Sequence, residues 1–195
     1  LFKTGYFTKI QLLESPDHTL TINLTEAPTI AEIDIKGNSL IKTQQIKDVL
    51  LKVGLQVGDM LSPSTLLRVQ QSLEEQYETL GKYPATVTTN TENLSRNRVK
   101  LDLIISEGLN TKVAQIDFVG NQYFKTNELL DNFTLSTPSL FTIFNSDDQF
   151  TQTKLSQSIQ GLSDYYTDNG FLKFHVNSSE AALTSTKKQA LLTIS

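Results

Sequence analysis

The chain has 195 residues, of which 38% are hydrophobic and 19% charged, a composition typical of a folded globular protein rather than a disordered one. Its 17 Lys and Arg are outnumbered by 21 Asp and Glu, and the formal net charge of −4 argues against nucleic acid as a partner. Because cysteine is absent, disulfides, zinc–thiolate sites and cysteine nucleophiles are excluded.

No stretch of the sequence predicts a membrane-spanning helix, which requires about 18 consecutive apolar residues. The chain begins at Leu1 without a methionine and ends at Ser195 within an alternating pattern. We therefore expect it to be part of a longer protein.

The first predicted elements are two strands joined by a turn. Pro16, Asp17 and His18 form the expected turn, and after it apolar residues alternate with polar ones. A period of two is typical of a strand with one buried face. The apolar positions of this strand are Leu20, Ile22 and Leu24.

A repeat begins after this strand. The segment Ile30–Asn38 reappears as Val113–Asn121, and in both copies the alternating residues end in Gly-Asn. Glycine and asparagine tolerate the positive φ of a tight turn, so each segment predicts a strand followed by a turn. The residues expected to face the core are Ala31, Ile33, Ile35, Ala114, Ile116 and Phe118.

Two helices are predicted after each of these strands. Thr43 and Thr126 are the expected N-caps of the first helix in each copy. The second helix of the first copy begins at Ser62-Pro63 and ends before Gly81. Gly170 occupies the matching position in the second copy. The predicted apolar stripes are Leu66, Val69, Leu73, Tyr77 and Leu80, and Leu155, Ile159, Leu162 and Tyr166.

Two more strands complete each copy. The penultimate strand is predicted directly after the helix-ending glycine, at Tyr83–Asn90 and at Phe171–Asn177. The last strand is predicted over 99–105 and 190–194. The order is therefore β-α-α-β-β, with the end of one copy in residues 1–27, a complete copy in 28–108 and a nearly complete copy in 109–195.

This order resembles the POTRA domain, the polypeptide-transport-associated repeat of the outer-membrane barrel-assembly superfamily. The features that carry the resemblance are the Gly37-Asn38 strand end, the Tyr77 and Gly81 helix end, and the Glu107-Gly108 junction. The resemblance implies an α+β fold of tandem POTRA domains. Each domain would have a three-stranded mixed sheet packed on two antiparallel helices. The chain would hold the C-terminal part of a first domain, a complete second domain and a nearly complete third domain.

The resemblance also implies a function. We expect a periplasmic scaffold that binds unfolded outer-membrane β-barrel proteins and assembly-machinery lipoproteins by strand addition at exposed sheet edges. It would reach the membrane only through a C-terminal barrel that this chain does not contain. The alternative is the POTRA region of another outer-membrane transporter, of the two-partner secretion type or of the related translocation factors.

The resemblance further implies that the penultimate strand is the exposed edge. Pro84 would interrupt this strand in the second domain and blunt its edge. The third domain lacks such a proline, and its predicted docking edge consists of Phe171, Leu172, Lys173, Phe174, His175, Val176 and Asn177. Ala181 and Leu183, just beyond this strand, are possible contacts for a lipoprotein. The aromatic segment 137–145 is interpreted as packing against the third domain's helices rather than as a contact surface.

Catalysis is not expected. The two histidines, His18 and His175, are interpreted as exposed residues, and neither lies in a metal-ligand spacing. The carboxylate pairs Glu74-Glu75 and Asp147-Asp148 are predicted to be solvated rather than acid–base pairs, because adjacent helical residues diverge. We expect no metal, no cofactor and no nucleic acid. A hydrolase or ligand-binding protein built on a similar repeat is the alternative from another class.

Overall fold

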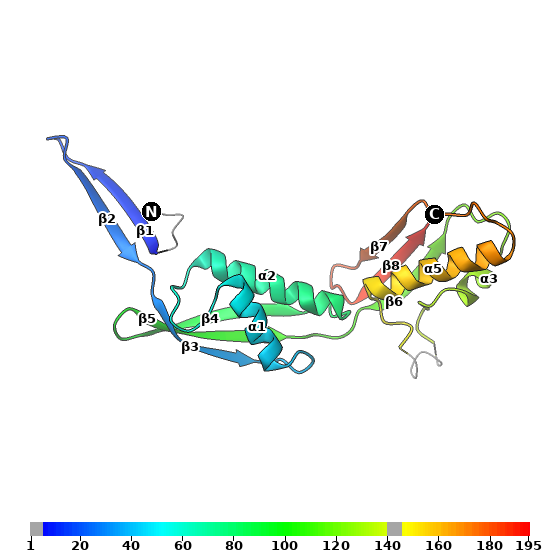
Figure 1. Cartoon of the computed structure of the whole chain (residues 1–195), viewed down its shortest axis with the longest axis horizontal. Helices are drawn as coiled ribbons and strands as arrows, with labels where there is room; N and C mark the ends of the chain where they lie inside the picture. The colour runs from blue at the N-terminus through cyan, green and yellow to red at the C-terminus, as the bar shows by residue number, and fades with distance from the viewer. Residues whose placement is uncertain (1–5, 140–145) are drawn as a thin grey trace. The chain divides into compact units, whose positions relative to one another are not determined.

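The computed structural model describes residues 6–139 and 146–195. The chain divides into two compact units, one formed by Leu1–Glu75 with Thr86–Glu107 and the other by Gln76–Ala85 with Gly108–Ser195. Figure 1 shows a β-hairpin followed by two sheets that each carry helices.

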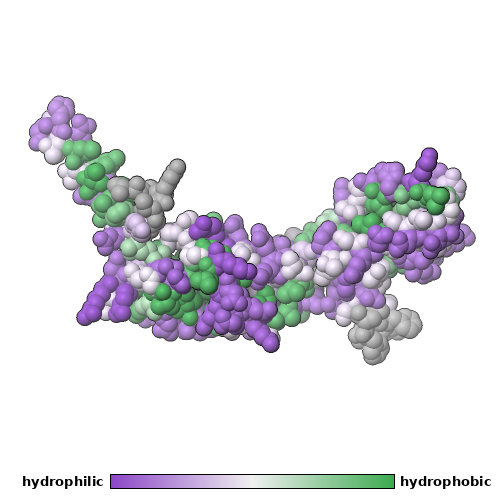
Figure 2. Space-filling model, viewed as in Figure 1, coloured by the Kyte–Doolittle hydropathy of each residue, from purple (hydrophilic) through white to green (hydrophobic). Residues whose placement is uncertain are grey.

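The hairpin consists of β1 (Phe7–Glu14) and β2 (Leu20–Glu26), which pair antiparallel. The predicted turn is confirmed, and His18 lies in it with a φ of 63°. The alternating apolar residues of the hairpin are exposed rather than buried: the exposed fraction is 64% for Leu12 and 47% for Ile22. Figure 2 shows this apolar surface on the hairpin.

The first complete repeat contains β3 (Thr29–Lys36), α1 (Thr43–Val53), α2 (Pro63–Thr79), β4 (Thr86–Leu94) and β5 (Arg98–Ser106). Its sheet has the order β3-β5-β4, with β3 parallel and β4 antiparallel to the central strand. The helices lie over one face of the sheet (Figure 1).

The second repeat contains β6 (Lys112–Phe118), α3 (Thr126–Asp131), α5 (Gln152–Asp168), β7 (Ser179–Leu183) and β8 (Gln189–Ile194). Its sheet has the equivalent order β6-β8-β7, again with one parallel and one antiparallel pair. The predicted α+β fold, with two repeats and mixed three-stranded sheets, is confirmed. Of the aromatic segment 137–145, residues 140–145 lie outside the described part of the chain.

The cores form between the central strands and the helices. Along β5, alternate side chains are buried, as the period of two predicts. The helix stripes contribute the facing residues, although Leu80, predicted to be buried, lies beyond the end of α2 and is exposed. The buried side chains of this layer include Ile46, Val49, Leu50, Val69, Leu73, Val99, Leu101, Leu103 and Ile105.

The first strand of each repeat departs from simple alternation. The register shifts between Ile30 and Glu32 in β3 and between Val113 and Gln115 in β6. Such a shift adds an unpaired residue to one strand, so the alternation changes phase there. Ile30 and Val113 are consequently buried, whereas Ala114, predicted to face the core, is exposed.

The helix starts are close to the predicted positions. Thr43 and Thr126 are the first helical residues rather than the N-caps, which are Lys42 and Lys125. The amide of each lysine instead donates to a side chain of the first turn, Lys42 to Gln45 Oε1 at 3.1 Å and Lys125 to Glu128 Oε2 at 3.0 Å. The Ser62 hydroxyl caps α2 as predicted, accepting from the Thr65 amide at 3.2 Å.

The penultimate strand begins later than predicted in both repeats: β4 overlaps the predicted Tyr83–Asn90 over residues 86–90, whereas β7 lies wholly after the predicted Phe171–Asn177. The strand does not follow directly after the glycine, because a turn comes first. Ala85 N donates to Lys82 O at 3.0 Å, and Phe174 N donates to Phe171 O at 3.0 Å. The edge strands therefore begin later, at Thr86 and at Ser179. The apolar residues of the second segment, and those of the first before Thr86, therefore pack in a turn rather than in a strand.

Candidate functional site

Each three-stranded sheet has two edges, and the edge formed by β3 is covered at its N-terminal end. Its residues bond to the connection between α1 and α2: Ile30 N donates to Asp59 O at 2.9 Å, and Leu61 N donates to Pro28 O at 2.8 Å. These bonds occupy the start of this edge, and the bulge between Ile30 and Glu32 interrupts its regular pairing geometry.

The edge formed by β6 is covered at its N-terminal end in the same way. Val113 N donates to Asp148 O, and Phe150 N donates to Thr111 O, both at 2.8 Å. The Asp148 carboxylate is buried and accepts from Lys112 Nζ at 2.6 Å, so its prediction as a solvated side chain was wrong. Both repeats thus occupy the start of the same edge.

The edge formed by β4 is open. Antiparallel pairing makes successive residues point their N–H and C=O groups alternately toward the partner strand and away from it. Val87 N donates to the Glu74 carboxylate of α2, so the groups of Val87 face away from β5. Thr89, Thr91 and Asn93 share this phase, since the nine-residue pairing with β5 has no register shift.

The edge formed by β7 is open as well, but it is shorter, at five residues. Ser178 and Ser195 exchange backbone hydrogen bonds, and Thr184 N donates to Gln189 O at 3.0 Å. Ser178 and Thr184 therefore point their backbone groups toward β8. The residues that alternate with them point these groups away from β8; they are Ser179, Ala181 and Leu183.

The structure corrects three predictions about these edges. Ala181 and Leu183 belong to the edge strand itself rather than lying beyond it. Pro84 lies in the turn before β4, so it does not interrupt the strand. The edge of the second predicted domain is therefore not blunted, and it is longer than that of the third.

The predicted docking segment Phe171–Asn177 forms an irregular connection instead of an edge strand. Phe174 stacks on Tyr166 with ring centroids 3.8 Å apart, and Phe171 packs on Tyr123 at 4.8 Å. With residues 118–123, the segment lines a cavity of about 610 Å³. The segment takes no part in the sheet's strand pairing, so it does not form a sheet edge, and Leu172 is 80% exposed.

Helix α2 contacts β4 at its open edge. Gln70 Nε2 donates to Thr89 Oγ1 at 3.5 Å, and the Glu74 carboxylate accepts from Val87 N at 2.8 Å. One turn before Gln70, the side chain of Leu67 is 54% exposed. Glu74 is half-buried, so its prediction as a solvated residue was wrong. The sequence offered one indication of this: Glu74 directly follows Leu73, a buried residue of the helix stripe, so it lies at the border of the core.

The open face of the first repeat's sheet is charged. Lys100 Nζ lies 3.0 Å from Glu32 and 2.7 Å from Asp34. Lys100, by its hydrogen bond and charge, holds the pKa of Asp34 below its ordinary value, and the two carboxylates raise the pKa of Lys100. A partner laid over this face would have to remove water from these charges, which is costly. The open edge offers a more favourable contact.

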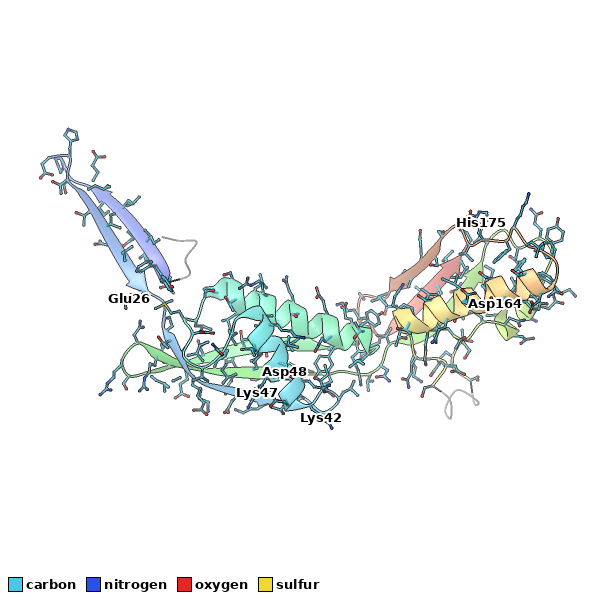
Figure 3. The ribbon with its side chains drawn as sticks, viewed as in Figure 1. Glu26, Lys42, Lys47, Asp48, Asp164 and His175 are labelled. Carbon is cyan, nitrogen blue, oxygen red and sulfur yellow. The ribbon has the colours of Figure 1, made fainter. Side chains whose placement is uncertain are left out.

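Both histidines are exposed, as predicted. His18 lies 3.2 Å from Glu14 in the hairpin turn, and His175 lies in the connection after α5 (Figure 3). Across residues 6–139 and 146–195, no group of His, Asp and Glu is arranged to hold a metal ion. Nor is any helix within these ranges long and apolar enough to cross a membrane.

Comparison with known proteins gives matches along the whole chain. The family model POTRA, described as "Surface antigen variable number repeat", matches residues 28–108 and 111–195. The outer membrane protein assembly factor BamA of Neisseria meningitidis serogroup B is 28% identical over 194 residues, which cover 100% of this chain and 24% of that protein. The same factor of Buchnera aphidicola is 24% identical, covering 100% of this chain and 31% of that protein.

A solved structure agrees in fold. The POTRA1-3 region of the periplasmic domain of Omp85 from Anabaena superposes with a TM-score of 0.50 at 15% identity, covering 99% of this chain and 76% of that chain. At this identity the match shows the fold alone. The chain spans about a quarter to a third of the length of the curated relatives it matches.

Proposed function

Because this chain belongs to the POTRA family, we propose that it is part of a periplasmic scaffold for outer-membrane β-barrel assembly, and that it binds extended segments of unfolded barrel proteins. The relatives named as outer membrane protein assembly factors support this role. We propose that the chain acts by binding and not by catalysis.

The observation that carries the proposal is the pair of open sheet edges, β4 and β7. In both repeats a loop occupies the start of the other edge and a bulge interrupts it, whereas these two strands keep a regular row of outward backbone groups. An extended peptide can satisfy such groups by adding a strand to the sheet. Backbone pairing is largely independent of sequence, as a scaffold with many clients requires.

The expected affinity is low. Thr89, Thr91 and Asn93 together offer about six backbone hydrogen bonds, each contributing roughly 1 kcal/mol net. Association costs at least about 4 kcal/mol, so backbone pairing alone leaves about 2 kcal/mol and binding weaker than millimolar. Side-chain contacts would bring the affinity into the range between roughly millimolar and micromolar. Weak binding suits a scaffold that has to release its client.

A lipoprotein partner would use the third predicted domain. Ala181 and Leu183 lie on the phase of β7 whose backbone groups face outward, so they combine side-chain contact with strand addition. A client and a lipoprotein would then compete for β7, whereas β4 would stay available to the client.

We expect an extended peptide with the sequence of an outer-membrane barrel strand to shift the amide resonances of β4 and β7 in an NMR titration of the chain. The reason is that new hydrogen bonds form at Thr89, Thr91 and Asn93 and at Ser179, Ala181 and Leu183. A peptide methylated on alternate backbone nitrogens is the control, because it cannot pair. Shifts confined to the helices, or to the cavity beside Phe171–Asn177, would contradict the proposal.

A further inference from the structure

The open edge of β4 is not uniform along its length. At its N-terminal end the outward-facing N–H of Val87 is already bonded to the Glu74 carboxylate, 2.8 Å away. Farther along the strand, Thr89, Thr91 and Asn93 have the same phase, and no described residue outside the sheet bonds to their backbone groups. One end of the edge is therefore occupied by a side chain of α2.

A hydrogen bond from a backbone N–H to a carboxylate is stronger than one to a neutral carbonyl, because the acceptor is charged. A visiting strand offers only a carbonyl oxygen to the Val87 N–H. To pair there it would have to displace Glu74 and leave this half-buried carboxylate without its donor, at a net cost. At Thr89, Thr91 and Asn93 no such competition exists.

We propose that Glu74 is a register-determining residue, which stops an added strand before Val87 and confines its pairing to Thr89–Asn93. The inference rests on the proposed function, since it concerns a strand that docks on β4. It specifies how many residues of a client this edge holds. A client strand would be bound by a short stretch along Leu67 and Gln70 of α2, and released without breaking a long ladder.

The second repeat lacks this feature. Ser163 follows the buried Leu162 of α5 as Glu74 follows the buried Leu73 of α2. The Ser163 hydroxyl donates to Ile159 O at 3.0 Å, within its own helix, and β7 receives no carboxylate from this position. The two edges are thus expected to differ, with the register restricted at β4 alone.

The test replaces the carboxylate and follows the Val87 amide. In the Glu74→Ala variant, we expect a ten-residue barrel-strand peptide to protect Val87 N–H from hydrogen exchange, which it does not do in the unchanged chain. The gain of one net hydrogen bond should raise the affinity about fivefold. The exposed neighbour Glu75→Ala makes the same change in net charge and should alter neither result. Glu74→Gln keeps an accepting oxygen but loses the charge, so it should retain the stop only in part and fall between the unchanged chain and Glu74→Ala.

The outcomes separate the two proposals. If the peptide protects Thr89, Thr91 and Asn93 in every variant but Glu74→Ala gains neither Val87 protection nor affinity over Glu75→Ala, the role of Glu74 is wrong and strand addition stands. If the peptide leaves all β4 amides unprotected in every variant, strand addition at this edge is wrong, and the inference about Glu74 falls with it. A cooperative unfolding transition, recorded for each variant by circular dichroism, verifies that the variant is folded before unfolding begins.

Discussion

Replacing Thr91 with proline is expected to weaken strand binding at β4 strongly while the sheet stays folded. The Thr91 N–H faces away from β5, so proline removes a donor that only a visiting strand would use. The pyrrolidine ring also occupies the space that the backbone of the visiting strand needs. We expect the affinity at β4 to fall at least about tenfold and the free energy of unfolding to fall by about 1 kcal/mol.

The matched control is Asn90→Pro, one residue away. Asn90 pairs with Asp102 in the opposite phase, so its N–H belongs to the ladder with β5. Proline there should cost at least about 2 kcal/mol of unfolding free energy, because a ladder bond is lost within the sheet. The β7 amides serve as an internal reference for peptide binding in both variants. Unchanged binding at β4 in Thr91→Pro would show that clients do not pair with this edge.

Replacing Gly37 with alanine is expected to destabilise the first repeat by about 4 kcal/mol or more. Gly37 has a φ of +83°, and a Cβ added to it would lie 2.0 Å from the carbonyl oxygen of Ile105. The obstacle is backbone of the adjoining strand, which cannot move aside as a flexible side chain can. The loop after β3 is also held by Glu107, whose carboxylate accepts from the amides of Ser39 and Leu40 at 2.6 and 2.8 Å.

Gly54 provides the control for this prediction. It ends α1 with nearly the same φ, +82°, but a Cβ there would meet nothing within 4 Å. Gly54→Ala should therefore cost only the left-handed strain, about 1–2 kcal/mol. Urea unfolding monitored at the resonances of β3–β5 measures both variants. Equal destabilisation would mean that the close approach to Ile105 contributes nothing.

The sequence allowed the fold to be predicted because each repeat carries its periods and turn residues in the same order. The β-α-α-β-β order, the buried faces of α1 and β5, and the glycine ends of the helices all follow from local patterns. The bulges in β3 and β6 did not, because a register shift depends on pairing with a distant strand. The change of phase is not visible in an alternating sequence.

The position of the edge could not be predicted for a related reason. Phe171–Asn177 alternates as a strand would, yet Phe171 and Phe174 pack into an aromatic cluster and the backbone turns. Pro84 was predicted to lie inside the edge strand and blunt it, but it lies in the turn before β4. Glu74 was missed because its function depends on a neighbour in β4 that only the folded sheet brings close.

The most direct test of strand addition is hydrogen exchange at the β4 amides, residue by residue, with and without a barrel-strand peptide. Pairing at this edge should protect Thr89, Thr91 and Asn93 and leave the already bonded Thr88, Asn90 and Glu92 unchanged, an alternation that no other binding mode produces. Protection without alternation, or protection that appears only in the helices, would contradict the account.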